Sequence, residues 1–254
     1  MNEVSLPKTG DTAIPELLEP QHLSEVLALQ DATRAALPDD QKMFVLPQPS
    51  AYFEKLLARE NGLMLGMRVD GKLVAQIALM GPLTLEEAMD KNIITRNDVA
   101  FHHAGPSESV IVMKSMSVHP EWGGNGLSQH LLQAALGLPS VRVADHVFAQ
   151  ISAENNRSWA LFLRNGFGIV AAAVDPQDKK PRFVLQRPAL GFALHNLPSV
   201  EDSNPLADFS SIMRMTQREA LVGRLDDVAG MKLAFHAPSE AAASWYDKSA
   251  QTGP

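Results

Sequence analysis

A glycine-rich turn between two apolar segments is the part of this sequence best suited to chemistry. An apolar run over residues 110–118 leads into a turn with three glycines, Gly123, Gly124 and Gly126, and a run with helical periodicity follows over 127–136. This order predicts a strand, a turn and a helix. Glycine allows backbone N–H groups to face outward, and a helix amino terminus carries partial positive charge. The turn therefore predicts a phosphate or pyrophosphate site, with an ordinary tight turn as the alternative.

Several other kinds of chemistry lack the residues they need. The chain has no cysteine, which excludes disulfides, thiolate metal sites and a cysteine nucleophile. His102 and His103 are adjacent and lack a third ligand at helical spacing, so no metal site is expected. No Gly-Lys-Ser/Thr sequence of a nucleotide-binding loop occurs, and Ser128 lacks the glycine two residues later that a nucleophile elbow requires.

The elements that position the turn follow from the apolar periodicity along the chain. Asp70-Gly71 joins two apolar runs and predicts a hairpin, because both central residues of a type I′ turn need positive φ. A later helix opens near Asn155, with Asn156 or Ser158 as its expected cap. Hairpins in the first half and strand–helix–strand units in the middle predict a mixed α/β (α+β) sheet with flanking helices. The expected helices cover 22–37 and 50–59, and the other expected strands cover 63–69, 72–79, 143–152, 167–174 and 182–186.

The two ends of the chain differ from the middle in composition. Residues 1–19 contain prolines and little periodicity, which predicts a flexible N-terminal arm. Residues 188–208 are rich in Pro, Asn, Asp and Ser and are expected to form a linker. The patterned region 209–235 fits either a helix or a pair of strands, and the chain after Pro238 is expected to be partly disordered.

The overall composition limits the partners of the chain. Its 254 residues, 45% of them hydrophobic, are enough for one core plus a small appendage. The formal net charge of −7 argues against a broad basic face for nucleic acid. No apolar run is long enough to cross a bilayer, and the N-terminus lacks the basic and apolar pattern of a secretory signal. We therefore expect no nucleic-acid or membrane partner and a cytoplasmic location.

In order and separation, these pieces resemble the GNAT superfamily of N-acetyltransferases over residues 20–187. Three features carry the resemblance: the Asp70-Gly71 hairpin preceded by two helices, Val118-x-Pro120 with the glycine turn, and Asn155-x-x-Ser158-x-x-x-Phe162-x-x-x-Gly166-Phe167. The segment with the glycine turn is similar to the family's pyrophosphate motif, and the Asn155 segment is similar to its other cofactor motif. The resemblance implies a central mixed, largely antiparallel sheet flanked by helices, with 188–254 as a C-terminal extension.

The cofactor implied by the resemblance is acetyl-CoA, as co-substrate and without a metal. Backbone N–H groups of the turn would bind the pyrophosphate, and the strand before the turn would pair with the pantetheine arm. Asn155 matches a position that commonly contacts that arm. The implied cofactor-binding residues are Met116, Val118, Gly123, Gly124, Asn125, Gly126, Leu127, Ser128, Asn155 and Phe162.

The sequence departs from the family pattern at three of these positions. Gly123 stands where the turn usually begins with Arg or Gln, and Ser128 stands where it usually closes with Gly or Ala. Phe162 stands where the family often has a tyrosine, whose hydroxyl can protonate the departing CoA thiolate. The proton would then come from another side chain or from solvent, or the activity would be weak.

The implied reaction is direct attack of a neutral amine on the acetyl-CoA carbonyl, which needs a base near the acceptor. The first candidate base is Glu108, followed by His103 and His119, although an exposed Glu or a solvated His is the simpler interpretation of each. The in-strand carboxylate that many family members use is missing, because residues 114–117 are Lys-Ser-Met-Ser. A backbone N–H of the strand ending at Val118 would stabilise the oxyanion.

The predicted function is therefore an acyl-CoA-dependent N-acetyltransferase that acts on the primary amine of a small molecule. One alternative is a non-catalytic acyl-CoA-binding module that serves as a sensor or assembly partner. Another is a protein acetyltransferase whose segment 190–254 docks a partner, and a homodimer is left open. The acceptor pocket would come from the segments around 38–52 and 82–109, which show no motif that names the amine.

Overall fold

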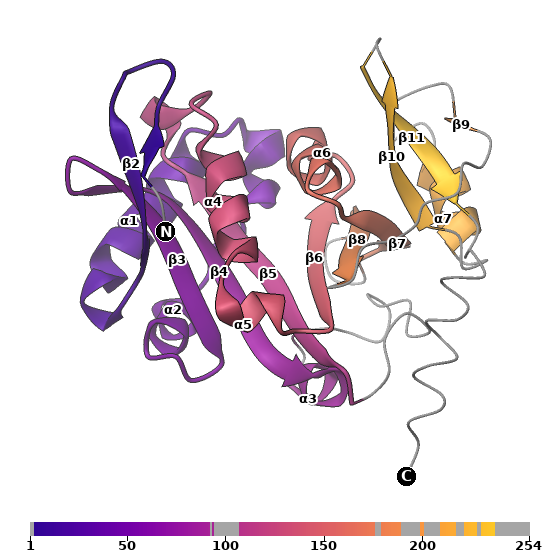
Figure 1. Ribbon diagram of the computed structural model, residues 1–254, viewed down its shortest axis with the longest axis horizontal. Coiled ribbons are helices and arrows are strands. Elements are labelled where there is room, and N and C mark those ends of the chain that lie inside the picture. The colour runs from indigo at the N-terminus through magenta and orange to yellow at the C-terminus, as the bar shows by residue number, and fades with distance from the viewer. Residues whose placement is uncertain are drawn as a thin grey trace. The chain divides into compact units, whose positions relative to one another are not determined.

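The computed structural model describes residues 3–91, 93, 107–175, 179–188, 199–200, 209–216, 221–227 and 230–236. The chain divides into two compact units. Unit 1 contains Met1–Pro82 and Ile111–Val143, and unit 2 contains Leu83–Val110 and Ala144–Pro254. Strands β4 and β5, which Figure 1 labels, cross the boundaries between these segments.

Unit 1 holds a sheet of five strands in the order β1-β2-β3-β4-β5. Strands β3 and β4 pair antiparallel through Asp70-Gly71, whose φ angles of 48° and 77° are both positive. The predicted hairpin is therefore confirmed. The elements of unit 1 are β1 (Val4–Ser5), β2 (Thr12–Leu17), α1 (Leu23–Ala35), α2 (Ser50–Leu57), β3 (Gly62–Val69), β4 (Lys72–Thr84), β5 (Ser109–Val118), α4 (Leu127–Leu136) and α5 (Pro139–Arg142), with 3-10 turns η1 (Pro20–His22), η2 (Asp39–Phe44) and η4 (Pro120–Trp122).

The N-terminal residues belong to this sheet, so the prediction of a flexible arm was wrong. Strand β2 pairs antiparallel with β3, with Leu17 opposite Leu65. Ala13 is buried whereas the neighbouring Ile14 is 48% exposed, as expected for a strand with one covered face. The alternation is short and contains a proline, so the sequence pattern alone did not reveal it.

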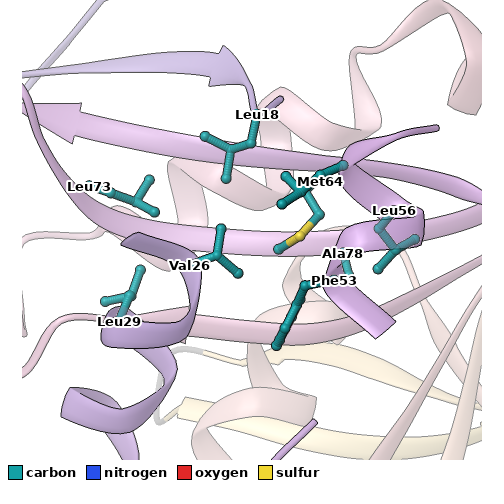
Figure 2. Packing of buried hydrophobic residues seen from close by; sticks show 9 residues of the cluster. Leu18, Val26, Leu29, Phe53, Leu56, Met64, Leu73 and Ala78 are labelled. Carbon is teal, nitrogen blue, oxygen red and sulfur yellow. The ribbon is translucent and has the colours of Figure 1, made fainter. Parts of the chain in front are cut away.

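Helices α1 and α2 cover the sheet of unit 1 through a continuous apolar cluster (Figure 2). Val26 and Leu29 of α1 and Phe53 of α2 are buried against side chains from the strands. The amphipathic spacing of these helices turns one face toward the sheet. The buried members of the cluster are Leu18, Val26, Leu29, Phe53, Leu56, Leu57, Met64, Leu73 and Ala78. The cluster fixes α2, which carries Tyr52, against β3 and β4.

An ion pair network ties α1 to the strands of the same unit. Arg68 on β3 pairs with Glu16 on β2, and its Nη2 lies 2.5 Å from Oε2 of Glu25 on α1. The hydrogen bond to Arg68 lowers the pKa of Glu25, and the same pairing raises the pKa of Arg68. The Glu25 carboxyl is about two-fifths exposed, with a side-chain exposure of 41%, so solvent screens the pair.

We expect Glu25→Gln to lower the free energy of unfolding by less than about 1 kcal/mol at pH 7. Because the folded-state pKa of Glu25 is lowered, its contribution is complete above the unfolded value of 4.5 and disappears as the pH falls through the folded value. Urea unfolding of wild type and variant between pH 7 and acid measures this difference. The exposed Glu54→Gln is the control, and a Glu25 deficit that persists at acid pH would contradict the assignment.

Unit 2 holds another set of strands, in the order β6-β8-β7-β10-β11-β9. Strand β8 pairs antiparallel with both β6 and β7, and β10 pairs antiparallel with β11. Helix α6 packs on this sheet, with Trp159 in edge contact with Phe183 at 6.2 Å between ring centroids. The elements of unit 2 are α3 (Leu85–Asp90), β6 (His146–Ser152), α6 (Asn156–Arg164), β7 (Gly168–Val174), β8 (Pro181–Pro188), β9 (Ser199–Val200), α7 (Phe209–Thr216), β10 (Leu221–Asp227) and β11 (Gly230–His236).

The structure resolves the choice that the sequence left open for residues 209–235. The region forms both a helix, α7, and a hairpin, β10–β11. Ile212 of α7 is buried, and Phe209 lies 5.8 Å from Phe183 between ring centroids. This part of the C-terminal extension therefore packs within unit 2, while most of the predicted linker and the chain after Pro238 lie outside the described residues.

Two element boundaries differ from the sequence prediction by three residues or more. The strand expected over 143–152 begins at His146, because α5 occupies Pro139–Arg142 and Val143 caps its end. The strand expected over 72–79 continues to Thr84, which then caps α3 by accepting a hydrogen bond from the N–H of Glu87 at 3.1 Å. The predicted fold class is confirmed: a mixed α/β, largely antiparallel sheet flanked by helices.

Candidate functional site

The glycine-rich turn has the strand–turn–helix geometry that the sequence predicts. Strand β5 ends at Val118, the 3-10 turn η4 follows, and α4 begins at Leu127. Gly124 and Gly126 have φ angles of 78° and 75°, in the left-handed region that favours glycine. The two glycines therefore allow the chain to reverse directly before the helix.

Five consecutive backbone N–H groups of this turn have no hydrogen-bond partner among the described residues. They belong to Gly124, Asn125, Gly126, Leu127 and Ser128. Such a row at the start of the ten-residue α4 is suited to bind an anion, because the N–H groups and the helix dipole act together.

Gly123 differs from the other predicted turn residues. Its N–H donates to the carbonyl of Pro120 at 3.1 Å, so this group closes the 3-10 turn. Its own carbonyl accepts a hydrogen bond from the Lys8 ammonium at 3.3 Å. The N–H of Gly123 is therefore engaged within the protein, unlike those of the next five residues.

Asn125 is buried and holds the turn together, with only 2% of its surface exposed. Its Nδ2 donates to the carbonyl of Trp122 at 3.2 Å, and its Oδ1 accepts from the N–H of Lys8 at 3.1 Å. The Asn125 side chain therefore serves the turn itself and joins it to the N-terminal segment.

Strand β5 contains a strained residue in its C-terminal half. Ser115 has φ 52°, which is uncommon for a residue other than glycine. Strained backbone concentrates where a fold holds a functional group in place. The positions predicted to follow the pantetheine arm, Met116 and Val118, come directly after it and are half-buried.

Tyr52 is a functional candidate that the sequence analysis missed. Its hydroxyl donates to Met80 Sδ at 3.9 Å, and the Ser115 side chain lies close enough to influence the pKa of the phenol. Burial raises the pKa of the Tyr52 phenol, and the Ser115 side chain opposes part of that rise. A protonated hydroxyl therefore lies beside the strained residue of β5. Nothing in the local sequence of α2 indicates this contact, because it depends on how the helix packs on the sheet.

His119 lies between β5 and the glycine turn. Its backbone N–H donates to the carbonyl of Val74 at 2.8 Å, and its side chain is 17% exposed. The imidazole Nδ1 lies 3.7 Å from a carboxylate oxygen of Glu121, beyond hydrogen-bond distance, and has no hydrogen-bond partner among the described residues. Of the two predicted bases that the structure describes, His119 is the one placed next to the turn in unit 1.

Glu108, the first candidate base, is engaged with a buried histidine of unit 2. Its Oε2 lies 2.8 Å from Nε2 of His146, which is fully buried. Gln186 donates from Nε2 to Nδ1 of His146 at 2.8 Å, which leaves the Nε2–H of the imidazole to donate to Glu108. The carboxylate of Glu108 therefore already accepts a hydrogen bond within the protein. His103 lies outside the described residues.

The other predicted cofactor motif opens helix α6 in unit 2. Asn155 is the N-cap, and its Oδ1 accepts from the N–H of Ser158 at 3.2 Å, so the prediction of Asn156 or Ser158 as the cap was wrong. Phe162 is buried and lies 4.9 Å from Phe167 between ring centroids. Its aromatic ring therefore packs inside the unit.

Comparison with protein families connects this geometry to a reaction class. The sequence profile of the acetyltransferase (GNAT) family matches residues 29–167, more than half of the chain, including the glycine turn and the Asn155 motif. The chain belongs to the acetyltransferase (GNAT) family. This membership confirms the predicted enzyme class, an acyl-CoA-dependent N-acetyltransferase.

Solved GNAT structures share the fold at low sequence identity. A GNAT acetyltransferase from Streptococcus agalactiae has 16% identity and a TM-score of 0.52, with 72% of this chain and 98% of that chain covered. Diaminobutyrate acetyltransferase from Paenibacillus lautus, solved with L-2,4-diaminobutyric acid and coenzyme A, has 13% identity and a TM-score of 0.50 (72% and 99% covered). NAA60 of Arabidopsis thaliana, solved with acetyl-CoA, has 14% identity and a TM-score of 0.50 (69% and 98% covered). No curated protein matches the chain.

Metal centres and membrane spans are both absent from the part of this GNAT chain that the structure describes. No group of three or more His, Asp or Glu side chains there is arranged to hold a metal ion. No helix among the described residues is long and apolar enough to span a bilayer.

Proposed function

We propose that this GNAT protein transfers the acetyl group of acetyl-CoA to the primary amine of a small molecule. The observation that carries the proposal is the row of unpartnered N–H groups from Gly124 to Ser128 at the start of α4, counted among the described residues. In a chain that belongs to the GNAT family, this row is suited to the pyrophosphate of acetyl-CoA. The half-buried positions Met116 and Val118 of β5 are the proposed contacts of the pantetheine arm.

Direct transfer requires a neutral amine and a carbonyl that accepts negative charge. The amine nitrogen attacks the thioester carbonyl, the C–N bond forms, and the C–S bond breaks to release the CoA thiolate. A base takes the proton that the amine loses, and an acid or solvent protonates the thiolate. Among the predicted bases, His119 is supported by an imidazole Nδ1 without a hydrogen-bond partner among the described residues. Glu108 and His103 stay predictions.

We assign the proton donor to Tyr52, in place of the hydroxyl that Phe162 lacks. The support is its contact with Ser115 at the strained part of β5. A phenol with a raised pKa stays protonated at neutral pH, as an acid must before it donates. The two residues belong to unit 1, which also contains the glycine turn.

Two observations support a small acceptor amine. Within the same fold, one relative is a diaminobutyrate acetyltransferase solved with its small substrate, and the formal net charge of −7 suits a cationic small molecule. A protein amine is the other candidate. The cytoplasmic location and the homodimer stay predictions.

Isothermal titration with acetyl-CoA, run beside free CoA, is the first test of this proposal. We expect a Kd in the micromolar range, about 1 to 100 μM. A screen of small diamines and amino acids by thiol release then identifies the acceptor, with peptides that have free N-termini as the comparison. Absence of binding at millimolar acetyl-CoA would contradict the proposal. Turnover of peptides alone would move the acceptor to proteins.

A further inference from the structure

The segment between β1 and β2 places a cation on the glycine turn of the same unit. The N–H of Lys8 donates to Oδ1 of the buried Asn125 at 3.1 Å, and its ammonium donates to the carbonyl of Gly123 at 3.3 Å. A β-carbon at Gly124 would collide with Nζ of Lys8 and lie 2.9 Å from its Cε. The Lys8 side chain therefore lies directly against Gly124, where the row of unpartnered N–H groups begins.

The position of Lys8 is held by the backbone around it. The N–H of Leu6 donates to the carbonyl of Asp11 at 2.8 Å, and the N–H of Gly10 donates to the carbonyl of Leu6 at 2.9 Å. Leu6 is fully buried, and Val4 pairs with Ala13 in the adjoining strands. These contacts form a closed loop that holds the backbone of Lys8 next to the turn, so only its side chain has to be ordered when a ligand binds.

The Lys8 ammonium has no carboxylate partner within ion-pair distance among the described residues. Its hydrogen-bond partner is the neutral carbonyl of Gly123. An ammonium beside several free N–H donors favours a ligand with more than one negative charge, because both kinds of donor act on the same anion. This combination distinguishes the turn from an ordinary helix start.

We infer that Lys8 is a binding residue for the pyrophosphate of acetyl-CoA, which it contacts from the N-terminal segment. The inference rests on the proposed function and adds a residue from a distant part of the sequence to the same site. The ammonium neutralises part of the diphosphate charge while the N–H groups of Gly124 to Ser128 orient it. If Lys8 instead obstructed the turn, removal of its ammonium would tighten the binding of acetyl-CoA.

The test compares Lys8→Gln and Lys8→Arg with the wild type by isothermal titration. We expect Lys8→Gln to weaken the binding of acetyl-CoA by about 5- to 20-fold and Lys8→Arg to restore affinity to within about 3-fold. Dephospho-CoA, which keeps the pyrophosphate and lacks the 3′-phosphate, should lose the same factor in Lys8→Gln. The slope of log Kd against log salt should also decrease in this variant.

The control and the contrary outcomes separate this inference from the proposed function. Lys55→Gln removes an exposed lysine from α2 and should leave affinity unchanged. Unchanged or tighter binding in Lys8→Gln would overturn the role of Lys8 while leaving the proposed function intact. An affinity loss for CoA that is absent for dephospho-CoA would move Lys8 to the 3′-phosphate and overturn the pyrophosphate assignment. Absence of acetyl-CoA binding in the wild type would overturn both.

Discussion

Replacement of Gly124 by alanine weakens acetyl-CoA binding by about 50-fold if the turn binds the pyrophosphate. The residue has φ 78°, and an added β-carbon collides with the Lys8 side chain. The substitution therefore displaces the cation and fills the space in front of the N–H groups. Isothermal titration with acetyl-CoA measures the effect directly.

Gly71→Ala is a matched control for this substitution. Gly71 has φ 77°, close to that of Gly124, but a β-carbon at Gly71 meets no atom within 4 Å. Both variants should lose about 1 to 2 kcal/mol of stability from the left-handed backbone, whereas only Gly124→Ala should lose affinity. Equal affinities in the two variants would show that the turn is an ordinary connection between strand and helix.

Removal of the Tyr52 hydroxyl gives the other large effect, a decrease in kcat of about 100-fold for Tyr52→Phe. The proposed acid is lost, and the thiolate must then take its proton from water. The affinity for acetyl-CoA should remain, because the turn and β5 are unchanged. Because burial raises the pKa of Tyr52, the wild-type rate should fall only at alkaline pH, above the usual range of a phenol, and this decline should be absent in Tyr52→Phe.

Measurements of kcat against pH with the acceptor amine at saturation test this role. Ser50→Ala removes an exposed hydroxyl from the same helix and should leave the rate unchanged. A wild-type kcat in Tyr52→Phe would assign the proton to solvent. A decrease in kcat that is accompanied by a large loss of thermal stability would indicate a packing role, since a single hydroxyl contributes only about 1 kcal/mol.

Local patterns in the sequence predicted several features of the fold and the turn. Asp70-Gly71 predicted the β3–β4 hairpin, and the three glycines after Val118 predicted the change from strand to helix. Each of these features depends on residues that are neighbours in the chain. Glycine at a turn indicates positive φ at one residue, and an apolar period describes one element. Both signals can therefore be recognised in the sequence alone.

One local feature was not predictable. Asn155, Asn156 and Ser158 all have side chains that can cap α6, and only the backbone conformation selected Asn155.

Contacts between distant segments were also not predictable from local patterns. The N-terminal segment was predicted to be flexible because it contains prolines and little periodicity. Strand β2 is stabilised by pairing with β3, which lies about fifty residues later, and no local pattern indicates that pairing.

The family, the fold class and the position of the glycine turn were predictable from the sequence, because they follow from short segments and their order. The groups that surround the turn and the reacting strand became known only from the folded structure. Lys8 hydrogen-bonds with Asn125, and Glu108 contacts His146. Tyr52 lies near Ser115. These pairs form only after the strands adopt their register and the helices pack on them. Such contacts join residues far apart in the chain, so they depend on the burial of a shared core and not on local conformational preference.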